Sequence, residues 1–250
     1  MHHEPIKISI VTICRNAHDV IEKTIKSVLE QDYNPIEYII IDGASVDGTL
    51  DVVRSYEDRL SRIISEPDEG IYDAMNKGVQ CASGDYILIL NAGDFLIHPS
   101  VIGNVARAIS DKNFKNIDVI SARLLVYTPN GQARIWSTKK STRLSRYHGS
   151  LPHPSTFQSK KAFRKNGLFD ATYRVAGDFE WFVRGYVANK LTFRSLNLLT
   201  TVFINDGVSV SVDWKKIQNL EIERLRAKHF SRRWRFWLDI GRFLKKNKLL

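Results

Sequence analysis

The strongest constraint on the fold of this chain is a short, continuous apolar segment that ends abruptly in polar residues. Residues 87–90 read Ile-Leu-Ile-Leu, and Asn91 and Asp94 follow at once, with two small residues between them. A strand that is apolar at every position is typical of a sheet covered by helices on both faces. Open sheets of parallel strands bind ligands beyond the carboxyl ends of their strands. An ordinary polar turn would give the same pattern, so this segment alone leaves both interpretations open.

The same pattern is repeated through the first third of the chain. Four segments are expected to form strands: residues 8–14, 37–41, 62–65 and 85–90. Segments with helical spacing lie between them: residues 18–31, 49–60 and 71–82. This alternation with short connections predicts an α/β fold with a mostly parallel, doubly wound sheet. The polar residues that follow the strands should line one edge of it: Arg15, Asn16, Asp42, Glu66, Asp68, Asn91 and Asp94.

The pattern changes after a helix that is expected over residues 100–110. Residues 119–127 and 133–137 flank a Pro-Asn-Gly turn, which predicts a β-hairpin. Shorter elements are expected beyond it: helices over 162–166 and 179–188, and strands over 191–193 and 202–204. A long helix begins at Asp213. We therefore divide the chain into an α/β domain, residues 1–212, and a basic helical appendage, residues 213–250.

The net charge of +10 is concentrated near the C-terminus. Residues 224–248 hold ten basic residues against one acidic residue, which accounts for +9 of that charge. A basic tail on a nearly neutral domain argues against a nucleic-acid-binding protein, so we expect no nucleic-acid partner. The two cysteines, Cys14 and Cys81, indicate no disulfide framework. No apolar run approaches the ~18 residues of a membrane-spanning helix, so we expect a cytoplasmic or peripheral membrane location.

Several motifs, taken in order, resemble one known family. They are residues 11–12, 41–49, 65–78, 84–94, 151–154 with 156–157, 167–170, 176–181 and 205–209. With this set the chain resembles the family 2 glycosyltransferases over residues 6–210, and in particular the bacterial enzymes that build colanic acid, O-antigen and other surface polysaccharides. The resemblance implies the GT-A fold, a Rossmann-like, mostly parallel central sheet flanked by helices.

The resemblance also implies roles for three carboxylates. Asp42 is expected to contact the nucleotide base, and Asp178 to be the catalytic base. A helix-capping role also remains open for Asp178. Residues 91–94 occupy the position of the family's Asp-x-Asp metal motif, but Asn91 and Gly93 stand where carboxylates often stand. Asp94 is therefore the carboxylate left in this motif to bind Mg²⁺ or Mn²⁺, hard cations that bind oxygen and bridge phosphates.

Further polar residues are candidates for binding the nucleotide sugar. They are Thr12, Arg15, Glu66, Asp68, Asp73, Asn76, Asn91 and His153. Structural roles remain open for several of them: capping or packing for Asp73 and Asn76, a turn for His153, and solvated loop charges for Glu66 and Asp68. One visible base and no positioned nucleophile favour an inverting single displacement.

The last helix has two chemically distinct faces when its residues are spaced at ~100°. One face is apolar: Phe230, Trp234, Trp237, Leu238, Ile240 and Leu244. The other is basic: Arg232, Arg235, Arg242 and Lys246. A basic amphipathic helix with tryptophans can lie in an anionic membrane interface, on the cytoplasmic face of the inner membrane. Packing of this helix on the domain is the alternative.

Together these patterns predict an inverting glycosyltransferase. It would move a sugar from a nucleotide-sugar donor to a polyprenyl-linked saccharide in the synthesis of lipopolysaccharide or exopolysaccharide. Because the Asp-x-Asp motif has fewer carboxylates here, an alternative remains open: a catalytically inactive nucleotide-sugar-binding module of the same fold.

Overall fold

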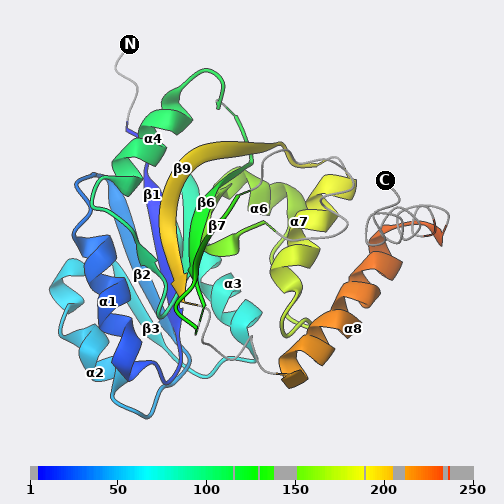
Figure 1. The fold of residues 1–250 in the computed structure, drawn as a ribbon. Helices are drawn as coiled ribbons and strands as arrows, with labels where there is room; N and C mark the ends of the chain where they lie inside the picture. Colours follow the sequence, from blue (N-terminus) through cyan, green and yellow to red (C-terminus); the bar gives the residue numbers. More distant parts are fainter. Residues whose placement is uncertain are drawn as a thin grey trace.

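The computed structural model describes residues 5–114, 116–128, 130–137, 151–188, 190–204, 212–232 and 236. One nine-stranded sheet forms its centre, in the order β3-β2-β1-β4-β8-β6-β9-β5, with β7 paired to β6 (Figure 1). The strands are β1 (Ile8–Cys14), β2 (Ile36–Asp42), β3 (Arg62–Ser65), β4 (Tyr86–Asn91), β5 (Phe95–Leu96), β6 (Val119–Tyr127), β7 (Ala133–Trp136), β8 (Thr156–Ser159) and β9 (Phe193–Ile204). The helices are α1 (His18–Leu29), α2 (Thr49–Arg54), η1 (Glu57–Arg59), α3 (Ile71–Cys81), α4 (Val101–Ser110), η2 (His153–Ser155), α6 (Lys160–Asn166), α7 (Gly177–Val187) and α8 (Val212–His229).

The first four strands of the chain, from β3 to β4, are parallel, as predicted. Their register brings the strand ends together, because Asp42 pairs with Cys14 on one side and with Ser65 on the other. Asn91 pairs with Ile13 at the same level. The polar residues that follow these strands therefore lie along one edge of the sheet. Beyond β4, strand β8 runs antiparallel to both β4 and β6, so the sheet is mixed.

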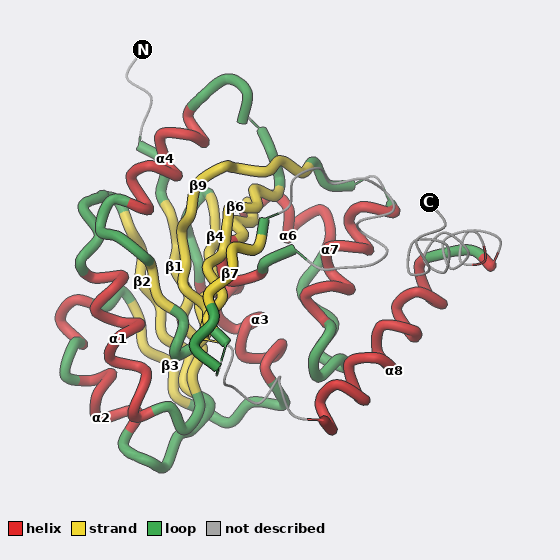
Figure 2. Tube along the Cα trace, viewed as in Figure 1, coloured by secondary structure: helices red, strands yellow, loops and turns green. Residues whose placement is uncertain are grey.

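The continuous apolar strands arise because both faces of the sheet are covered. Ile39 and Ile41 of β2 belong to one core, which includes residues of α3, α6 and α7. Tyr38 and Ile40 belong to the other core, which includes residues of α1, α2 and α4. Figure 2 shows α1 and α2 on one side of the sheet and α3 and α7 on the other. Successive strand residues point to opposite faces, so all of β1 and most positions of β2 and β4 are buried.

Two predicted boundaries are wrong. The helix expected over 49–60 ends at Arg54, and η1 takes up the following turn. The hydroxyl of Ser55 donates to the carbonyl oxygen of Val52 at 2.7 Å, a local bond that favours termination of a helix. Two short strands were expected, at 191–193 and 202–204. The structure has one long strand instead, β9, which runs unbroken from Phe193 to Ile204. The exposed polar residues in β9 interrupt the apolar pattern, so the sequence did not predict the strand as one element.

Helix α8 begins at Val212, close to the predicted start of the appendage, but it packs on the domain. Leu225 is fully buried in the core that contains α7, and Ile222 and Phe230 pack against the same core. Glu221 and Arg226 are also buried. The rest of the predicted amphipathic faces, apart from Arg232, lies outside the described residues. Within the described part of the chain, no helix is long and apolar enough to cross a membrane.

Candidate functional site

The loops after β1 and β2 are tied together at the strand-end edge. The backbone N–H of Asn16 donates to Ser45 Oγ at 2.8 Å, and the N–H of Val46 donates to Asn16 Oδ1 at 3.0 Å. Asn16 and Ala44 both have positive φ, 49° and 54°. Such conformations are unfavourable for residues other than glycine and are common where a loop is shaped for function. The two loops form one preformed wall of the candidate site.

Asp42 lies fully buried beneath these loops. Its carboxylate accepts hydrogen bonds from Ser45 Oγ at 2.5 Å, Ser45 N at 3.1 Å and Ser65 Oγ at 2.7 Å. In this arrangement Asp42 links the end of β2 to the end of β3. Through these hydrogen bonds Asp42 stabilises the loop after β2. Its contact with a nucleotide base remains a prediction.

Lys77 of α3 forms ion pairs with three acidic residues near Gly70, all of them predicted to bind the nucleotide sugar. Its ammonium lies 3.0 Å from Glu66 Oε1, 2.9 Å from Asp68 Oδ1 and 3.4 Å from Asp73 Oδ2. Burial acts to lower the pKa of Lys77, but hydrogen bonds with Asp68 and Glu66 outweigh this effect and raise it. From the sequence, Lys77 could be a surface lysine or approach a phosphate, and the surface position was favoured. The Asp73–Lys77 spacing of four residues was the signal that could have revealed this cluster.

Asp68 also approaches the loops of the wall. A Cβ added to Gly43 would lie 2.6 Å from Asp68 Oδ2 and 3.2 Å from Arg15 Cδ. The absence of a side chain at position 43 therefore lets Asp68 and Arg15 approach the strand end together. The structure brings these predicted residues to one place, where Arg15 is exposed and Asp68 is partly buried.

Two predicted residues lie apart from this surface. Thr12 is fully buried, and its hydroxyl lies 3.0 Å from the hydroxyl of Tyr38 in the core beneath α1. Asn76 is a structural clamp, because its Nδ2 donates to the carbonyl oxygen of Phe169 at 3.0 Å and its Oδ1 accepts from Phe169 N at 2.9 Å. For Asn76 the packing role that the sequence left open is the one the structure shows.

The end of β4 holds buried polar atoms that need partners. Asn91 Oδ1, Asp94 Oδ2 and His153 Nε2 are buried, and none has a hydrogen-bond partner among the described residues. Burial raises the pKa of the Asp94 carboxyl well above its usual range. Unpaired buried polar groups are rare in folded proteins, and each one indicates a missing partner or a functional role.

These orphaned atoms fit a hard divalent cation. The oxygens of Asp94 and Asn91 are the ligand type that Mg²⁺ and Mn²⁺ prefer. No cluster of three His, Cys, Asp or Glu side chains that could hold a metal occurs in the described ranges. A cation here would therefore need oxygen ligands from a bound diphosphate as well, which is how Mg²⁺ is commonly held in phosphate-binding sites.

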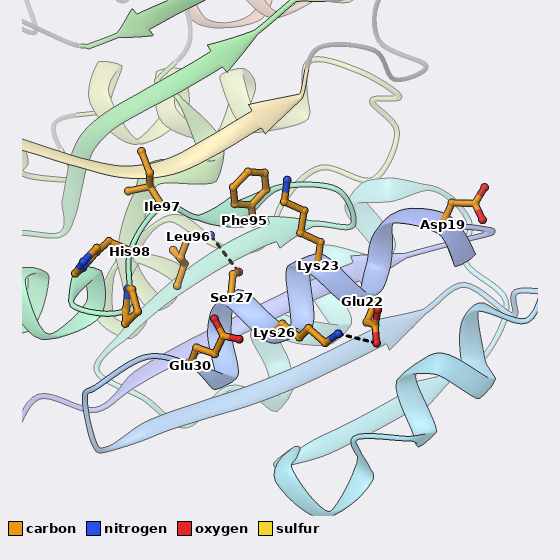
Figure 3. Close-up of a pocket in the computed structure, with 11 residues that line it drawn as sticks. Asp19, Glu22, Lys23, Lys26, Ser27, Glu30, Phe95, Leu96, Ile97 and His98 are labelled. Carbon is orange, nitrogen blue, oxygen red and sulfur yellow. Dashed lines mark hydrogen bonds and ion pairs between the residues drawn. The ribbon is translucent and has the colours of Figure 1, made fainter.

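Helix α1 holds the turn that carries Asp94. The hydroxyl of Thr24 accepts from Gly93 N at 3.0 Å, and that of Ser27 accepts from Leu96 N at 3.1 Å. Figure 3 shows the groove beyond this turn, with Lys23 beside Phe95; the lysine ammonium lies 3.7 Å from the ring centroid. No predicted site residue lines this groove. The contacts with Thr24 and Ser27 fix residues 93–96 against α1.

Asp178 lies in the first turn of α7 and is half-buried. The helix N-cap is Ala176, so the alternative that Asp178 is the capping residue is wrong. The hydroxyl of Tyr72 lies 3.2 Å from Asp178 Oδ1. Burial lowers the pKa of His153, and the negative charge of Asp178 acts in the opposite direction. The predicted base therefore lies near both Tyr72 and His153, and Tyr72 is a contact that the sequence interpretation missed.

This chain matches one protein family model and has curated relatives. Residues 9–174 match the family model described as glycosyl transferase family 2. An uncharacterized glycosyltransferase of Mycobacterium tuberculosis is 29% identical over 203 residues, covering 75% of this chain and 72% of the relative. A PGL/p-HBAD biosynthesis glycosyltransferase of Mycobacterium bovis is 25% identical over 202 residues, covering 80% of this chain and 77% of the relative.

Solved structures agree with the expected fold. S. aureus TarS 1–349 in complex with UDP matches with a TM-score of 0.69 at 20% identity, over 90% of this chain and 65% of that one. The mannosyltransferase PcManGT from Pyrobaculum calidifontis, in complex with GDP-Man and Mn²⁺, matches with a TM-score of 0.66 at 16% identity, over 91% of this chain and 64% of that one. The chain thus spans slightly less than two thirds of these solved chains, and the predicted GT-A fold is confirmed. Because the family model covers well over half of its length, this chain belongs to glycosyl transferase family 2 and is a glycosyltransferase.

Proposed function

We propose that this enzyme transfers a sugar from a nucleoside diphosphate sugar to a saccharide acceptor with inversion at the anomeric carbon. The observation that carries the proposal is the pair of orphaned buried oxygens, Asn91 Oδ1 and Asp94 Oδ2, at the carboxyl end of β4. Parallel sheets of this type bind ligands at that edge. A structural neighbour, TarS 1–349, was solved in complex with UDP, which supports a nucleotide ligand.

Asp178 is the proposed general base. The acceptor hydroxyl oxygen would attack the anomeric carbon as the bond from that carbon to the diphosphate oxygen breaks. The bonding electrons leave with the nucleoside diphosphate, and Asp178 takes the proton of the acceptor hydroxyl. One displacement on one face of the sugar gives inversion, and a carboxylate within reach of the hydroxyl is sufficient as the base. His153, buried near Asp178, would contact the diphosphate or the acceptor.

Asp94 and Asn91 would hold Mg²⁺ or Mn²⁺ against the diphosphate. A bound divalent cation would neutralise the negative charge of the leaving group. The neighbour PcManGT is a complex with Mn²⁺, which supports this cofactor. Arg15, Asp68 and the wall above Asp42 would bind the nucleoside, with Glu66 and Asp73 held beside them by Lys77.

The acceptor is proposed to be a polyprenyl-linked saccharide of a bacterial surface polysaccharide. The name of the M. bovis relative refers to the biosynthesis of PGL and p-HBAD, which supports a role in making cell-surface glycans. An acceptor anchored in lipid would require the enzyme to work at the cytoplasmic face of the membrane. The basic and aromatic residues after α8 are suited to peripheral binding there.

An inactive nucleotide-sugar-binding module remains the second candidate, favoured by the single carboxylate in residues 91–94. A thermal-shift titration with UDP, GDP and dTDP, each with and without Mn²⁺, tests ligand binding. One of them should stabilise the chain, and more strongly with Mn²⁺; no response to any of them would contradict the proposal. Hydrolysis of the matching nucleotide sugar then separates the candidates, because only the enzyme should release the nucleoside diphosphate.

A further inference from the structure

The loop that leads into α7 is held by a carboxylate from a helix far along the chain. Glu221 of α8 is only 8% exposed. Its Oε1 accepts a hydrogen bond from Arg174 N at 2.6 Å, and its Oε2 accepts from Val175 N and Ala176 N, both at 2.9 Å. Three backbone donors thus converge on one carboxylate. Charge-assisted bonds of this kind are roughly twice as strong as neutral ones.

These three donors lie immediately before Asp178. Ala176 is the N-cap of α7, and its own side chain makes no capping hydrogen bond. A negative charge beside the first turn of a helix is favourable because of the helix dipole. Glu221 therefore holds the backbone that leads into α7, including the amide of the N-cap residue, two to four residues from the proposed base.

Tyr72 of α3 also contacts the loop that leads into α7. Its hydroxyl lies 2.8 Å from the carbonyl oxygen of Val175 and 3.2 Å from Asp178 Oδ1. A Cβ added to Gly177 would lie 2.8 Å from the Tyr72 ring, so the backbone at 177 is pressed against that ring. The loop is thus confined between α3 and α8, and a shift of its backbone would move Asp178.

We infer that Glu221 is a positioning residue for sugar transfer, which fixes residues 174–176 so that Asp178 meets the acceptor hydroxyl. The inference rests on the proposed role of Asp178 as the base. It makes α8 part of the catalytic apparatus, although α8 supplies no group to the reacting atoms. A misplacement of about 1 Å in a reacting group can lower a rate by about 100-fold. The loss should therefore appear in kcat, because the nucleotide is bound elsewhere, along the ends of β1 to β4.

The test compares Glu221→Gln with Glu223→Gln in the full chain. Glu223 is on the same helix, but its side chain is 68% exposed and pairs with Arg226. Four donors are first compared with the wild-type enzyme and Mn²⁺: UDP-glucose, UDP-N-acetylglucosamine, GDP-mannose and dTDP-glucose. The donor with the highest turnover rate is then used for both variants. Glu221→Gln should lower kcat by about 10- to 100-fold. The donor KM, and the Kd of the released nucleoside diphosphate by calorimetry, should stay within about twofold of the Glu223→Gln values, because the nucleotide-binding edge is unchanged.

Hydrogen exchange provides a readout that does not require turnover. Amides in 174–178 should exchange faster in Glu221→Gln than in Glu223→Gln, because their acceptor is weakened. Equal kcat and equal exchange in the two variants would overturn the inference. If Glu221→Gln does not fold, Tyr72→Phe removes the opposite contact and should lower kcat in the same way; unchanged kcat in that variant would count against the inference.

Asp178→Asn separates this inference from the proposed function. Full turnover by Asp178→Asn would remove both the base assignment and the role of Glu221. An inactive Asp178→Asn beside a fully active Glu221→Gln would overturn only the positioning role and leave the proposed function standing.

Discussion

Asp94 combines two properties that normally oppose each other, since it is a carboxylate and it is 3% exposed with one oxygen unpaired. Its raised pKa means that the folded protein is penalised as pH rises from the usual carboxyl range toward the folded pKa. Asp94→Asn should therefore raise the melting temperature of the ligand-free enzyme at pH 7 by a few degrees, about 1 kcal/mol.

The same variant should lose the additional stabilisation that Mn²⁺ gives to the bound nucleoside diphosphate, because the ligand carboxylate is gone. Differential scanning fluorimetry with and without Mn²⁺ measures both effects. A lower melting temperature without ligand, or an undiminished response to Mn²⁺, would contradict the assignment of Asp94.

Lys77 should be more important for stability than its position on a surface helix suggests. Lys77→Met leaves Glu66, Asp68 and Asp73 without their shared cation, so the free energy of unfolding should fall by about 1–2 kcal/mol. Lys26→Met is the control, because Lys26 forms a single exposed pair with Glu22 at 3.0 Å that should contribute about 0.5 kcal/mol or less. Urea denaturation compares the two; equal losses would show that the Lys77 cluster is an ordinary surface feature.

Single residues at the ends of predicted elements could be proposed from the sequence, but contacts between distant parts of the chain could not. Asn91, Asp94 and Asp178 stand out because each adjoins an apolar segment. Tyr72 and Glu221 meet the residues around Asp178 only after more than 40 intervening residues have folded. Thr12 was predicted at the site because it lies near the end of β1, but its side chain points to the core beneath α1.

For helix α8, the pattern of polar and apolar residues predicts that a helix forms but does not predict which of its residues are buried against the domain. Leu220 is 73% exposed, whereas the adjacent Glu221 is buried. The burial of Glu221 depends on three backbone donors in a loop 45–47 residues earlier, which no local pattern encodes. The four parallel strands, by contrast, follow from local apolar runs that both cores require.

Removal of α8 should therefore damage the domain itself. A chain that ends at residue 211 loses fully buried Leu225. It also loses Lys228 and His229, two of the three ion-paired partners that Glu180 has among the described residues; Arg184 remains. It should unfold at a melting temperature at least 10 °C lower or fail to fold. The exposed core surface costs several kcal/mol, and the buried carboxylate of Glu180 is left with Arg184 alone of its three described ion-pair partners.

A chain that ends at residue 232 keeps all of α8 and is the matched control. Thermal unfolding followed by circular dichroism compares the two truncations. Cooperative unfolding of the shorter chain at the full-length temperature would contradict this expectation and support the predicted division into an independent domain, residues 1–212, and an appendage.

For the molecule as a whole, Glu37 ties the amino ends of three strands together. Its carboxylate accepts hydrogen bonds from Ser83 Oγ at 2.6 Å and Ser9 Oγ at 2.5 Å, and Lys7 Nζ lies at 3.2 Å. Burial acts to raise the pKa of Glu37, but the hydrogen bonds from Ser83 and Ser9 outweigh this effect and lower it from 4.5 to about 2. Their stabilisation is therefore complete above pH 4.5 and is lost as pH falls toward about 2.

Glu37→Gln should lower the free energy of unfolding at pH 7 by about 2 kcal/mol and flatten its dependence on pH between about 4.5 and 2.5. Glu57→Gln, at an exposed position on η1, should change neither quantity appreciably. Urea denaturation at several pH values measures the dependence. An acid limb of unchanged slope in Glu37→Gln would show that another group controls acid stability.

The central claim is that the strand-end edge binds the nucleotide sugar while Asp178, across the site, takes the proton. The most direct measurement is therefore turnover and nucleotide affinity of Asp178→Asn in the same preparation. Asparagine keeps the size and polarity of the side chain but cannot act as a base at neutral pH. We predict that kcat falls by at least about 100-fold, while the Kd of the nucleoside diphosphate with Mn²⁺ stays within about twofold of the wild-type value. Turnover within a few-fold of wild type would contradict the account.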